Sequence, residues 1–389
     1  MSPTISLALA VMVFSGAVTF FILFPIRRFA SRLGFLDRPG GHSSHRAVTP
    51  LGGGVGIFAG VLAAMIVITL GSASHDVSGA PTVHQFVPDT VMPVSWTETI
   101  ATHAIGVRSR MNEVWWLMAG CGVLVTLGVL DDRYGLPVAV RLGIQFAIAT
   151  IAVFGLQIEL TVYLTEPWVT KCLSVLWIVA VINSFNMLDN MDALSGGIAA
   201  IIAGSMAVVM WTTPDPGTDR PQFFVAGLLL IVAGACLGFL FHNRPPARVF
   251  MGDGGSYLVG FLIAVAMLMA TYAGGKTIET FRPHAVLAPL CAMAVPLYDM
   301  TTVLWIRMRE GRSPFVGDQS HLSHRLVDLG LSRSGAVATI HLVTATCGLS
   351  AMVLTHVPLL QAMAVLGIVV CMLTLLAILE STAWRRGRS

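Results

Sequence analysis

The sequence predicts an all-α fold, a polytopic membrane bundle of about eleven transmembrane helices. Of the 389 residues, 55% are hydrophobic and only 11% are charged, less than half the charged fraction of about 25% that soluble domains carry. The mean hydropathy is +0.79. Apolar runs of about 20 residues, the length that crosses a bilayer, recur along the whole chain. We expect one integrated bundle, a single domain over residues 1–389.

Eleven apolar runs are long enough to span a membrane. In chain order they are 4–25, 51–70, 113–130, 138–156, 168–186, 193–211, 222–241, 255–273, 285–306, 335–355 and 359–380. The first run has no basic segment before it and no clear small-residue cleavage site after it, which favours a retained helix over a signal peptide. Two connections are long: an irregular insert at 71–112 and a polar loop at 307–334.

Basic residues are concentrated on one side of the predicted bundle. If the runs cross the membrane alternately, seventeen of the 23 lysines and arginines fall on one side. That side holds segments 26–50, 131–137, 187–192, 242–254 and 307–334 and the C-terminal tail, together with the helix ends beside them, which add Arg141. Because positively charged loops face the cytoplasm, we predict an outside N-terminus and a cytoplasmic C-terminus. The 71–112 insert is then extracytoplasmic and the 307–334 loop is cytoplasmic.

Charge and cysteine usage exclude several functions. The formal net charge is only +3, so no nucleic-acid partner is suggested. The six cysteines all lie in apolar runs and form no CxxC pair. Small residues at helix contacts explain them better than disulfides or metal ligands do.

Aspartates gather on the predicted cytoplasmic side. They are Asp131, Asp132, Asp189, Asp192, Asp253 and Asp318. Ionisable groups at a membrane boundary cost energy and usually have a function. Asp131 and Asp132 are adjacent, and such carboxylates repel each other unless they share a proton or a cation. Arg141 follows near the start of the next helix and could bind a phosphate. A solvated helix end explains the pair equally well.

A polar ridge follows at the end of the run 168–186. Asn183, Asn186, Asp189 and Asp192 are spaced by three residues, so they share one face of a helix. A polar ridge in a membrane bundle must face protein or water rather than lipid. A site and a structural polar seam between helices both satisfy that requirement.

The segment 243–256 combines groups that suit a bound diphosphate. Backbone N–H groups at a glycine-rich helix start, here Gly252–Gly255, suit a phosphate. Asp253 suits Mg²⁺, which proteins bind through one or two carboxylates together with substrate phosphates. Phe250 offers a face for a nucleobase, and an ordinary glycine-rich loop is the alternative.

Two further cytoplasmic segments are less specific. The 307–334 loop holds several arginines with Asp318, His321 and His324. Basic residues near a bilayer can simply bind lipid headgroups, and the two histidines allow a metal pair, phosphate binding or proton transfer. His45 lies before the glycines at 52–54. Together the motifs describe a Mg²⁺–diphosphate site beside lipid, suited to phosphoryl transfer; zinc is disfavoured because no HExxH or Cys/His set is present.

At these motifs the sequence resembles the polyprenyl-phosphate N-acetylhexosamine-1-phosphate transferase family, to which the phospho-MurNAc-pentapeptide translocase is related. The resemblance runs from about Phe35 to Leu326. Its motifs are Asp37-x-Pro39 with His45 and Pro50-x-Gly52-Gly53; Asp131-Asp132 with Arg141 and Gln145; Asn186-x-x-Asp189-x-x-Asp192; Asn243 with Phe250-Met251-Gly252-Asp253-x-Gly255-Ser256; and Gly311-Arg312-Ser313-Pro314 before Asp318-x-x-His321-x-x-His324. Eleven spans with an outside N-terminus resemble the GlcNAc-1-phosphate branch more than the ten-span pentapeptide branch.

The resemblance implies a reaction at a bacterial inner membrane, with a cytoplasmic active site. Members of the family transfer N-acetylhexosamine-1-phosphate from a UDP-sugar to undecaprenyl phosphate. The products are undecaprenyl-diphosphate–sugar and UMP, and this is the first membrane step of cell-envelope polysaccharide synthesis. The cofactor is Mg²⁺, or Mn²⁺ in its place. The partners are therefore the UDP-sugar, the polyprenyl phosphate and membrane lipid, and a homodimer is allowed.

The resemblance also implies roles for individual residues. Asp253 would coordinate the metal, and Asp131 would be the base or nucleophile toward the lipid phosphate, with Asp132 supporting it. Asp192 would complete the catalytic polar network. The residues implied to bind substrate are Asn186, Asp189, Asn243 and Phe250 on the uridine side, with Arg141, Arg312, His321, His324 and His45 toward phosphate or sugar. Direct attack by the lipid phosphate and a covalent enzyme intermediate both remain open.

Three departures from the family pattern concern the sugar more than the chemistry. The usual Asp-Gly-x-Asp-Gly reads Asp189-Asn190-Met191-Asp192-Ala193 here, and the usual His-x-His-His of the loop reads His321-Leu322-Ser323-His324. The basic pair before His45 reads His42-Ser43. No acid is lost. The competing hypotheses are a transporter, in which buried acids mark an ion path, and a catalytically silent relative that binds lipid or nucleotide.

Overall fold

The computed structural model describes residues 2–32, 34–37, 48–73, 104, 106–160, 166–215, 220–270, 272, 282–314 and 318–386. These residues fold into a helical bundle with one small ribbon of two antiparallel strands, β1 (Leu36–Asp37) and β2 (Thr49–Pro50). In the described residues this ribbon, with an isolated bridge between Pro214 and Pro221, is added to the predicted all-α fold. Its partners are Leu36 with Pro50 and Asp37 with Thr49.

Most helices coincide with the predicted runs to within a few residues. They are α1 (Pro3–Arg32), α2 (Gly53–Ala73), α4 (Met111–Tyr134), α5 (Val138–Thr150), α6 (Pro167–Leu188), α7 (Leu194–Thr212), α8 (Phe223–Asn243), α9 (Gly252–Met269), α10 (Ala288–Ala292), α11 (Ala294–Arg309), α12 (Leu322–Asp328), α13 (Arg333–Leu354) and α14 (Leu359–Arg386). A π-helical turn continues α5 to Gly155, and a 3₁₀ turn from Pro283 precedes α10. Ten helices in the described residues are long and apolar enough to span a membrane, and a bent pair makes eleven.

The predicted run 285–306 is a bent pair of helical segments rather than one continuous helix. The chain bends by 65° between Pro283–Ala292 and Ala294–Arg309. Pro296 lies four residues after Ala292, so it cannot donate the helical hydrogen bond to the Ala292 carbonyl, and its ring crowds that carbonyl. Met293 is the residue at the break.

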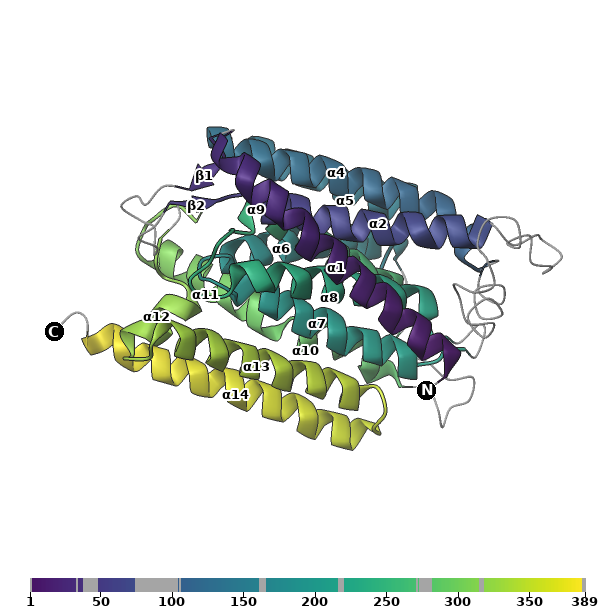
Figure 1. Ribbon diagram of the computed structural model, residues 1–389. Coiled ribbons are helices and arrows are strands. Elements are labelled where there is room, and N and C mark those ends of the chain that lie inside the picture. Colours follow the sequence, from purple (N-terminus) through teal and green to yellow (C-terminus); the bar gives the residue numbers. More distant parts are fainter. Residues whose placement is uncertain are drawn as a thin grey trace.

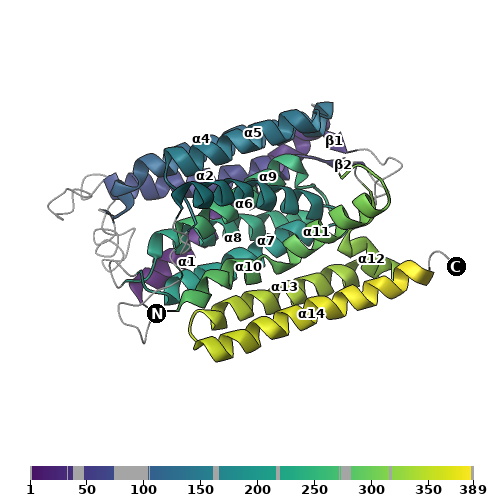
Figure 2. The same cartoon turned by 180° about the vertical axis from the view of Figure 1, so that it is seen from behind.

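The polar loop predicted at 307–334 is partly helical. It includes the end of α11, the helix α12 and the start of α13. Figures 1 and 2 show that β1, β2, α12 and the C-terminal end of α14 lie at one end of the bundle, opposite the N-terminus. That this end faces the cytoplasm stays a prediction from the distribution of arginines. Nearly all of the 71–112 insert lies outside the described residues.

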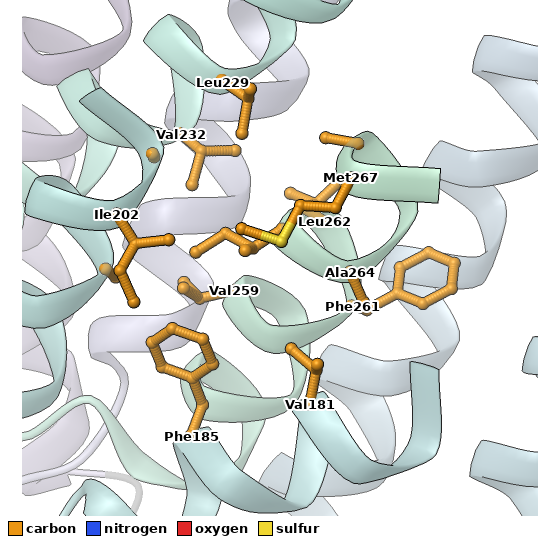
Figure 3. Packing of buried hydrophobic residues seen from close by; sticks show 14 of the residues in the cluster. Val181, Phe185, Ile202, Leu229, Val232, Val259, Phe261, Leu262, Ala264 and Met267 are labelled. Carbon is orange, nitrogen blue, oxygen red and sulfur yellow. The ribbon is translucent and has the colours of Figure 1, made fainter. Parts of the chain in front are cut away.

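Helix α9 forms the centre of the bundle. In its most apolar window 83% of residues are buried, compared with 17% in α1 and in α14. Figure 3 shows Val259, Leu262 and Met267 of α9 pointing toward residues of the neighbouring helices. Those labelled neighbours are Val181 and Phe185 of α6, Ile202 of α7, and Leu229 and Val232 of α8. A helix that is apolar on every side suits this central position.

Glycines let the helices approach closely where α9 begins. A Cβ atom on Gly128 of α4 would collide with the backbone of Gly254, and a Cβ on Gly54 of α2 would collide with the backbone of Gly255. Small residues are common at helix contacts in membranes, because lipid gives no hydrophobic force between helices and van der Waals packing must hold them together. The first turn of α9 is therefore held between α2 and α4 by backbone contact.

The segment before α9 is also fixed by backbone hydrogen bonds. Phe250 N–H donates to the carbonyl of Pro50, at 2.9 Å, and Gly53 N–H donates to the carbonyl of Phe250, at 2.9 Å. Gly54 N–H donates to the Met251 carbonyl, again at 2.9 Å. The ribbon, the start of α2 and the start of α9 are thereby joined at one end of the bundle.

We expect Gly128→Ala to lower the unfolding temperature in detergent, at a cost of about 1–3 kcal/mol, the usual effect of overpacking. The added methyl group would force α4 and α9 apart where their backbones touch. The matched control is Gly204→Ala in α7, where an added Cβ meets no atom within 4 Å. Equal unfolding temperatures for the two variants would show that the close approach of α4 and α9 is not required.

Candidate active site

Most of the predicted site residues meet around one cavity at the end of the bundle that holds the ribbon and α12. This polar cavity has a volume of about 330 Å³. It is lined by Asp37, Leu51, Asp132, Asp189, Asn190, Met191, Asp192, Asn243, Phe250, Gly252, Asp253, Asp318, His321 and His324. The lining comes from segments far apart in the sequence, so the fold brings residues of several polar motifs together.

A second cavity adjoins the first. It has a volume of about 420 Å³ and is lined by Val138, Arg141, Leu142, Asn183, Asn186, Met187, Asp189, Asn190, Tyr257, Met300, Leu304, Arg307, Pro314 and His321. This adjoining cavity combines apolar side chains with two arginines. Three residues, Asp189, Asn190 and His321, line both cavities. They form the wall that the two cavities share.

Two predicted site residues line neither of these cavities, and the position of a third is not described. Asp131 lines neither cavity. Arg312 lines a separate cavity of about 860 Å³ between α11 and α14, where it is bonded to Glu310 and, at 2.6 Å, to Asp318. His45 falls outside the described residues.

The adjacent acids Asp131 and Asp132 point to different partners. Asp131 is buried, and its carboxylate accepts hydrogen bonds from Arg141 Nη1 at 2.7 Å, Leu136 N–H at 2.8 Å and the Tyr257 hydroxyl at 3.1 Å. Asp132 instead lines the polar cavity. The resemblance implied that Asp131 reacts while Asp132 supports it, whereas the geometry makes Asp131 the anchor of Arg141 and turns Asp132 toward the cavity.

Asp253 is held by the polar ridge of α6. Asn186 Nδ2 donates to Asp253 Oδ1 at 2.7 Å and contacts the Ser256 hydroxyl at 3.2 Å. Asp253 N–H donates to Asp132 Oδ1 at 3.1 Å. Asn186, expected on the uridine side, therefore orients the carboxylate that was predicted to bind the metal.

At the glycine-rich start of α9, where a phosphate site was predicted, the backbone already bonds two carboxylates of the protein. The N–H of Asp253 is used by Asp132, and the backbone of Gly252 hydrogen-bonds Asp189. Gly254 and Gly255 pack against α4 and α2. Gly252 and Asp253 thus have carboxylate partners, and a phosphate site in this segment stays a prediction.

Asp189 lies just beyond the end of α6, among other acids. Its pKa is raised to about 7, mainly by burial and further by the carboxylates of Asp132 and Asp192. A bound cation stabilises carboxylates that are crowded in this way. Among the described residues no three His, Cys, Asp or Glu side chains form a complete metal site. The carboxylates named here offer oxygen atoms as ligands. Such ligands suit Mg²⁺, with its coordination completed by substrate phosphates or water.

Asp192 and Asn243 join the α6–α7 turn to the segment before α9. Asp192 Oδ2 accepts from Ala247 N–H at 2.9 Å. Asn243 accepts from Ala193 N–H at 2.8 Å and donates to the Val249 carbonyl at 2.9 Å. Both residues line the polar cavity, and their hydrogen bonds also hold its walls together.

Asp299 is a site residue that the sequence analysis missed. It lies on α11, is 0% exposed, and contacts His321 Nδ1 at 2.9 Å through Oδ2. Its Oδ1 accepts from Leu322 N–H at 2.6 Å, and Arg325 Nη2 lies 3.9 Å away. The sequence does carry the signal, because an acid inside an apolar run is a functional candidate by default.

The loop that carries His321 is anchored by ion pairs. Arg307, which is 4% exposed, donates to Asp318 Oδ1 at 2.9 Å through Nη2. Burial of Asp318 acts to raise its pKa, but hydrogen bonds from Arg307 and Ser320 outweigh this effect and hold the pKa well below its usual range. Burial and the nearby His321 lower the pKa of His324, so that His324 is neutral at pH 7.

Comparison with known proteins identifies similar chains. The family model described as Glycosyl transferase family 4 matches residues 114–271. A probable undecaprenyl-phosphate N-acetylglucosaminyl 1-phosphate transferase of Bacillus subtilis is 29% identical over 368 residues, 92% of this chain and 88% of that protein. The decaprenyl-phosphate N-acetylglucosaminephosphotransferase of Mycobacterium tuberculosis is 30% identical over 84% of this chain and 78% of its own length. The undecaprenyl-phosphate alpha-N-acetylglucosaminyl 1-phosphate transferase of Escherichia coli is 28% identical with the same coverage.

We expect Ala193→Gly to raise the unfolding temperature. Ala193 precedes α7 with φ 62° and ψ −2°, a left-handed conformation that costs an L-residue roughly 1–2 kcal/mol. Glycine avoids that cost and loses about 0.5–1 kcal/mol through its greater freedom when unfolded. The control Ala200→Gly, inside α7, should lower the unfolding temperature. If Ala193→Gly also lowers it, Ala193 is not strained.

Proposed function

Because the chain belongs to glycosyl transferase family 4, the polyprenyl-phosphate N-acetylhexosamine-1-phosphate transferases, we propose that it transfers N-acetylhexosamine-1-phosphate from a UDP-sugar to undecaprenyl phosphate. The names of the similar chains favour GlcNAc as the sugar. The observation that carries the proposal is the pair of cavities, one rich in carboxylates and one partly apolar, that share a wall.

The donor fits the polar cavity. Phe250 lines it with a ring that can stack on uracil, and Asp132 and Asp253 lie beside each other for the diphosphate end. Mg²⁺ or Mn²⁺ would be held by Asp253 with Asp132 next to it, and would neutralise charge on the diphosphate. Asn186 keeps the Asp253 carboxylate in position for this role.

The acceptor fits the adjoining cavity. Leu142, Met300 and Leu304 offer apolar contacts for a polyprenyl chain, while Arg141 and Arg307 offer positive charge for its phosphate. Since Asp131 and Asp318 already hold these two arginines, their guanidinium groups are fixed before the lipid arrives. Positioning of this kind is the main requirement of phosphoryl transfer.

The overall reaction forms one bond and breaks one. An oxygen of the lipid phosphate attacks the phosphorus that carries the sugar, the bond from this phosphorus to the oxygen of the uridine-bearing phosphate breaks, and UMP leaves with that oxygen. A direct attack and a two-step route through an enzyme carboxylate have the same net result in bonds formed and broken. In either route Asp132 is the member of the acid pair that faces the polar cavity. The reaction would take place on the cytoplasmic face of a bacterial inner membrane.

Purified protein with UDP-GlcNAc, Mg²⁺ and undecaprenyl phosphate should release UMP and form a lipid-linked sugar. Asp253→Asn should reduce UMP release at least about 100-fold, because positioned charge supplies most of the rate enhancement in phosphoryl transfer. The control Asp215→Asn lies in the connection between α7 and α8, at the other end of these helices, and should leave the rate unchanged. UDP-sugar binding without any UMP release would favour the hypothesis of a catalytically silent relative. Full activity of Asp253→Asn would contradict the proposal that Asp253 binds the metal.

A second prediction concerns Asp299. In Asp299→Asn one of the two carboxylate oxygens becomes an NH₂ group, so the side chain can no longer accept from both His321 and Leu322. We expect kcat to fall about 10- to 100-fold, the usual effect of losing the partner that orients a functional histidine. The KM for the UDP-sugar should change little. A wild-type kcat in a folded Asp299→Asn protein would show that the His321–Asp299 contact does not serve catalysis.

A further inference from the structure

Two of the positions at which this chain departs from its family pattern touch each other. Asn190 stands where the motif usually has glycine, and Ser323 stands where the loop usually has its middle histidine. They are 133 residues apart in the sequence, yet the Ser323 hydroxyl donates to Asn190 Oδ1 at 2.5 Å. The two residues that depart from the family pattern are therefore in direct contact.

The contact is fixed on both sides. Asn190 Nδ2 donates to the Met187 carbonyl at 3.0 Å, which turns Oδ1 toward Ser323. Ser323 is 1% exposed and lies between His321 and His324, which both line the polar cavity. The hydrogen bond thus joins the turn between α6 and α7 to the segment that carries His321 and His324.

The residue types at positions 190 and 323 depend on each other. A histidine at position 323 is larger than serine and, in so buried a place, would need the space that the Asn190 side chain now fills. A glycine at position 190 would supply that space, but with Ser323 retained it would leave a buried hydroxyl without its partner. Overpacking and a buried unpaired polar group each cost about 1–3 kcal/mol. Only the matched pairs, Asn with Ser or Gly with His, avoid both costs.

The contact lies where the sugar of the donor is expected to pass. Asn190 belongs to the wall that the polar and adjoining cavities share. If the donor binds in the first cavity and the acceptor in the second, as proposed above, the group in transfer must pass this wall. That group is the hexosamine-1-phosphate.

We propose that Asn190 and Ser323 form one coupled specificity element, which shapes the wall against the hexosamine of the UDP-sugar. The proposal rests on the transferase function, and it predicts that neither residue can be exchanged alone without loss. Exchanging both together restores the fit and changes the preferred sugar.

The test is a double-mutant cycle with UMP release measured for UDP-GlcNAc and UDP-GalNAc. Asn190→Gly and Ser323→His should each lower kcat/KM for the better donor about 10-fold or more. The double variant should recover most of this loss, and its ratio of kcat/KM between the two donors should differ from that of the wild type. The control Ser334→His, on an exposed serine at the start of α13, should alter neither quantity.

Ser323→Ala keeps the test open if the larger changes prevent folding, because it removes the hydrogen bond without adding bulk. It should shift the donor ratio at an unfolding temperature close to that of the wild type. Two results would overturn this inference and leave the proposed function intact. One is that the effects of the two exchanges are additive. The other is that the donor ratio is unchanged in every folded variant of an active enzyme. A wild type that releases no UMP from any donor would overturn the proposed function and this inference with it.

Discussion

The site depends on a backbone contact in which the first turn of α9 is held between α2 and α4. Gly128 and Gly54 touch the backbone of Gly254 and Gly255, so no side chain separates the helices there. This approach brings Asp253 within hydrogen-bonding distance of Asp132, 121 residues earlier, and of Asn186. The glycines therefore serve the chemistry by controlling distance, because each added methyl group would move one carboxylate away from another.

Charge is distributed in two layers around this contact. Asp131 with Arg141 and Asp318 with Arg307 are ion pairs that brace the walls. Inside them lie Asp132, Asp189 and Asp253, for which no ion pair with a basic side chain is found in the described part of the chain. Carboxylates that are crowded together without basic partners, such as these, suit a cation that arrives with an anionic substrate.

The sequence allowed most of the bundle to be predicted, because each span must be apolar over a length that the bilayer sets. The break at Met293 was not predicted, since hydropathy is insensitive to where a proline removes one hydrogen bond. The site was predicted as a set of residues, but not as a set of partners. Nothing local shows that Asp131 turns to Arg141, or that Ser323 reaches Asn190, since these contacts arise only when distant helices pack. Asp299 was missed because it lies inside a span.

The central claim is that the UDP-sugar binds in the polar cavity, with its diphosphate beside Asp132 and Asp253. The most direct test is an experimental structure of the wild-type protein with UDP-GlcNAc and Mn²⁺, in which anomalous scattering locates the metal. We expect the metal next to the Asp253 carboxylate, the uracil against Phe250, and the sugar near Asn190. A donor or metal bound in another place, such as the cavity between α11 and α14, would contradict this account.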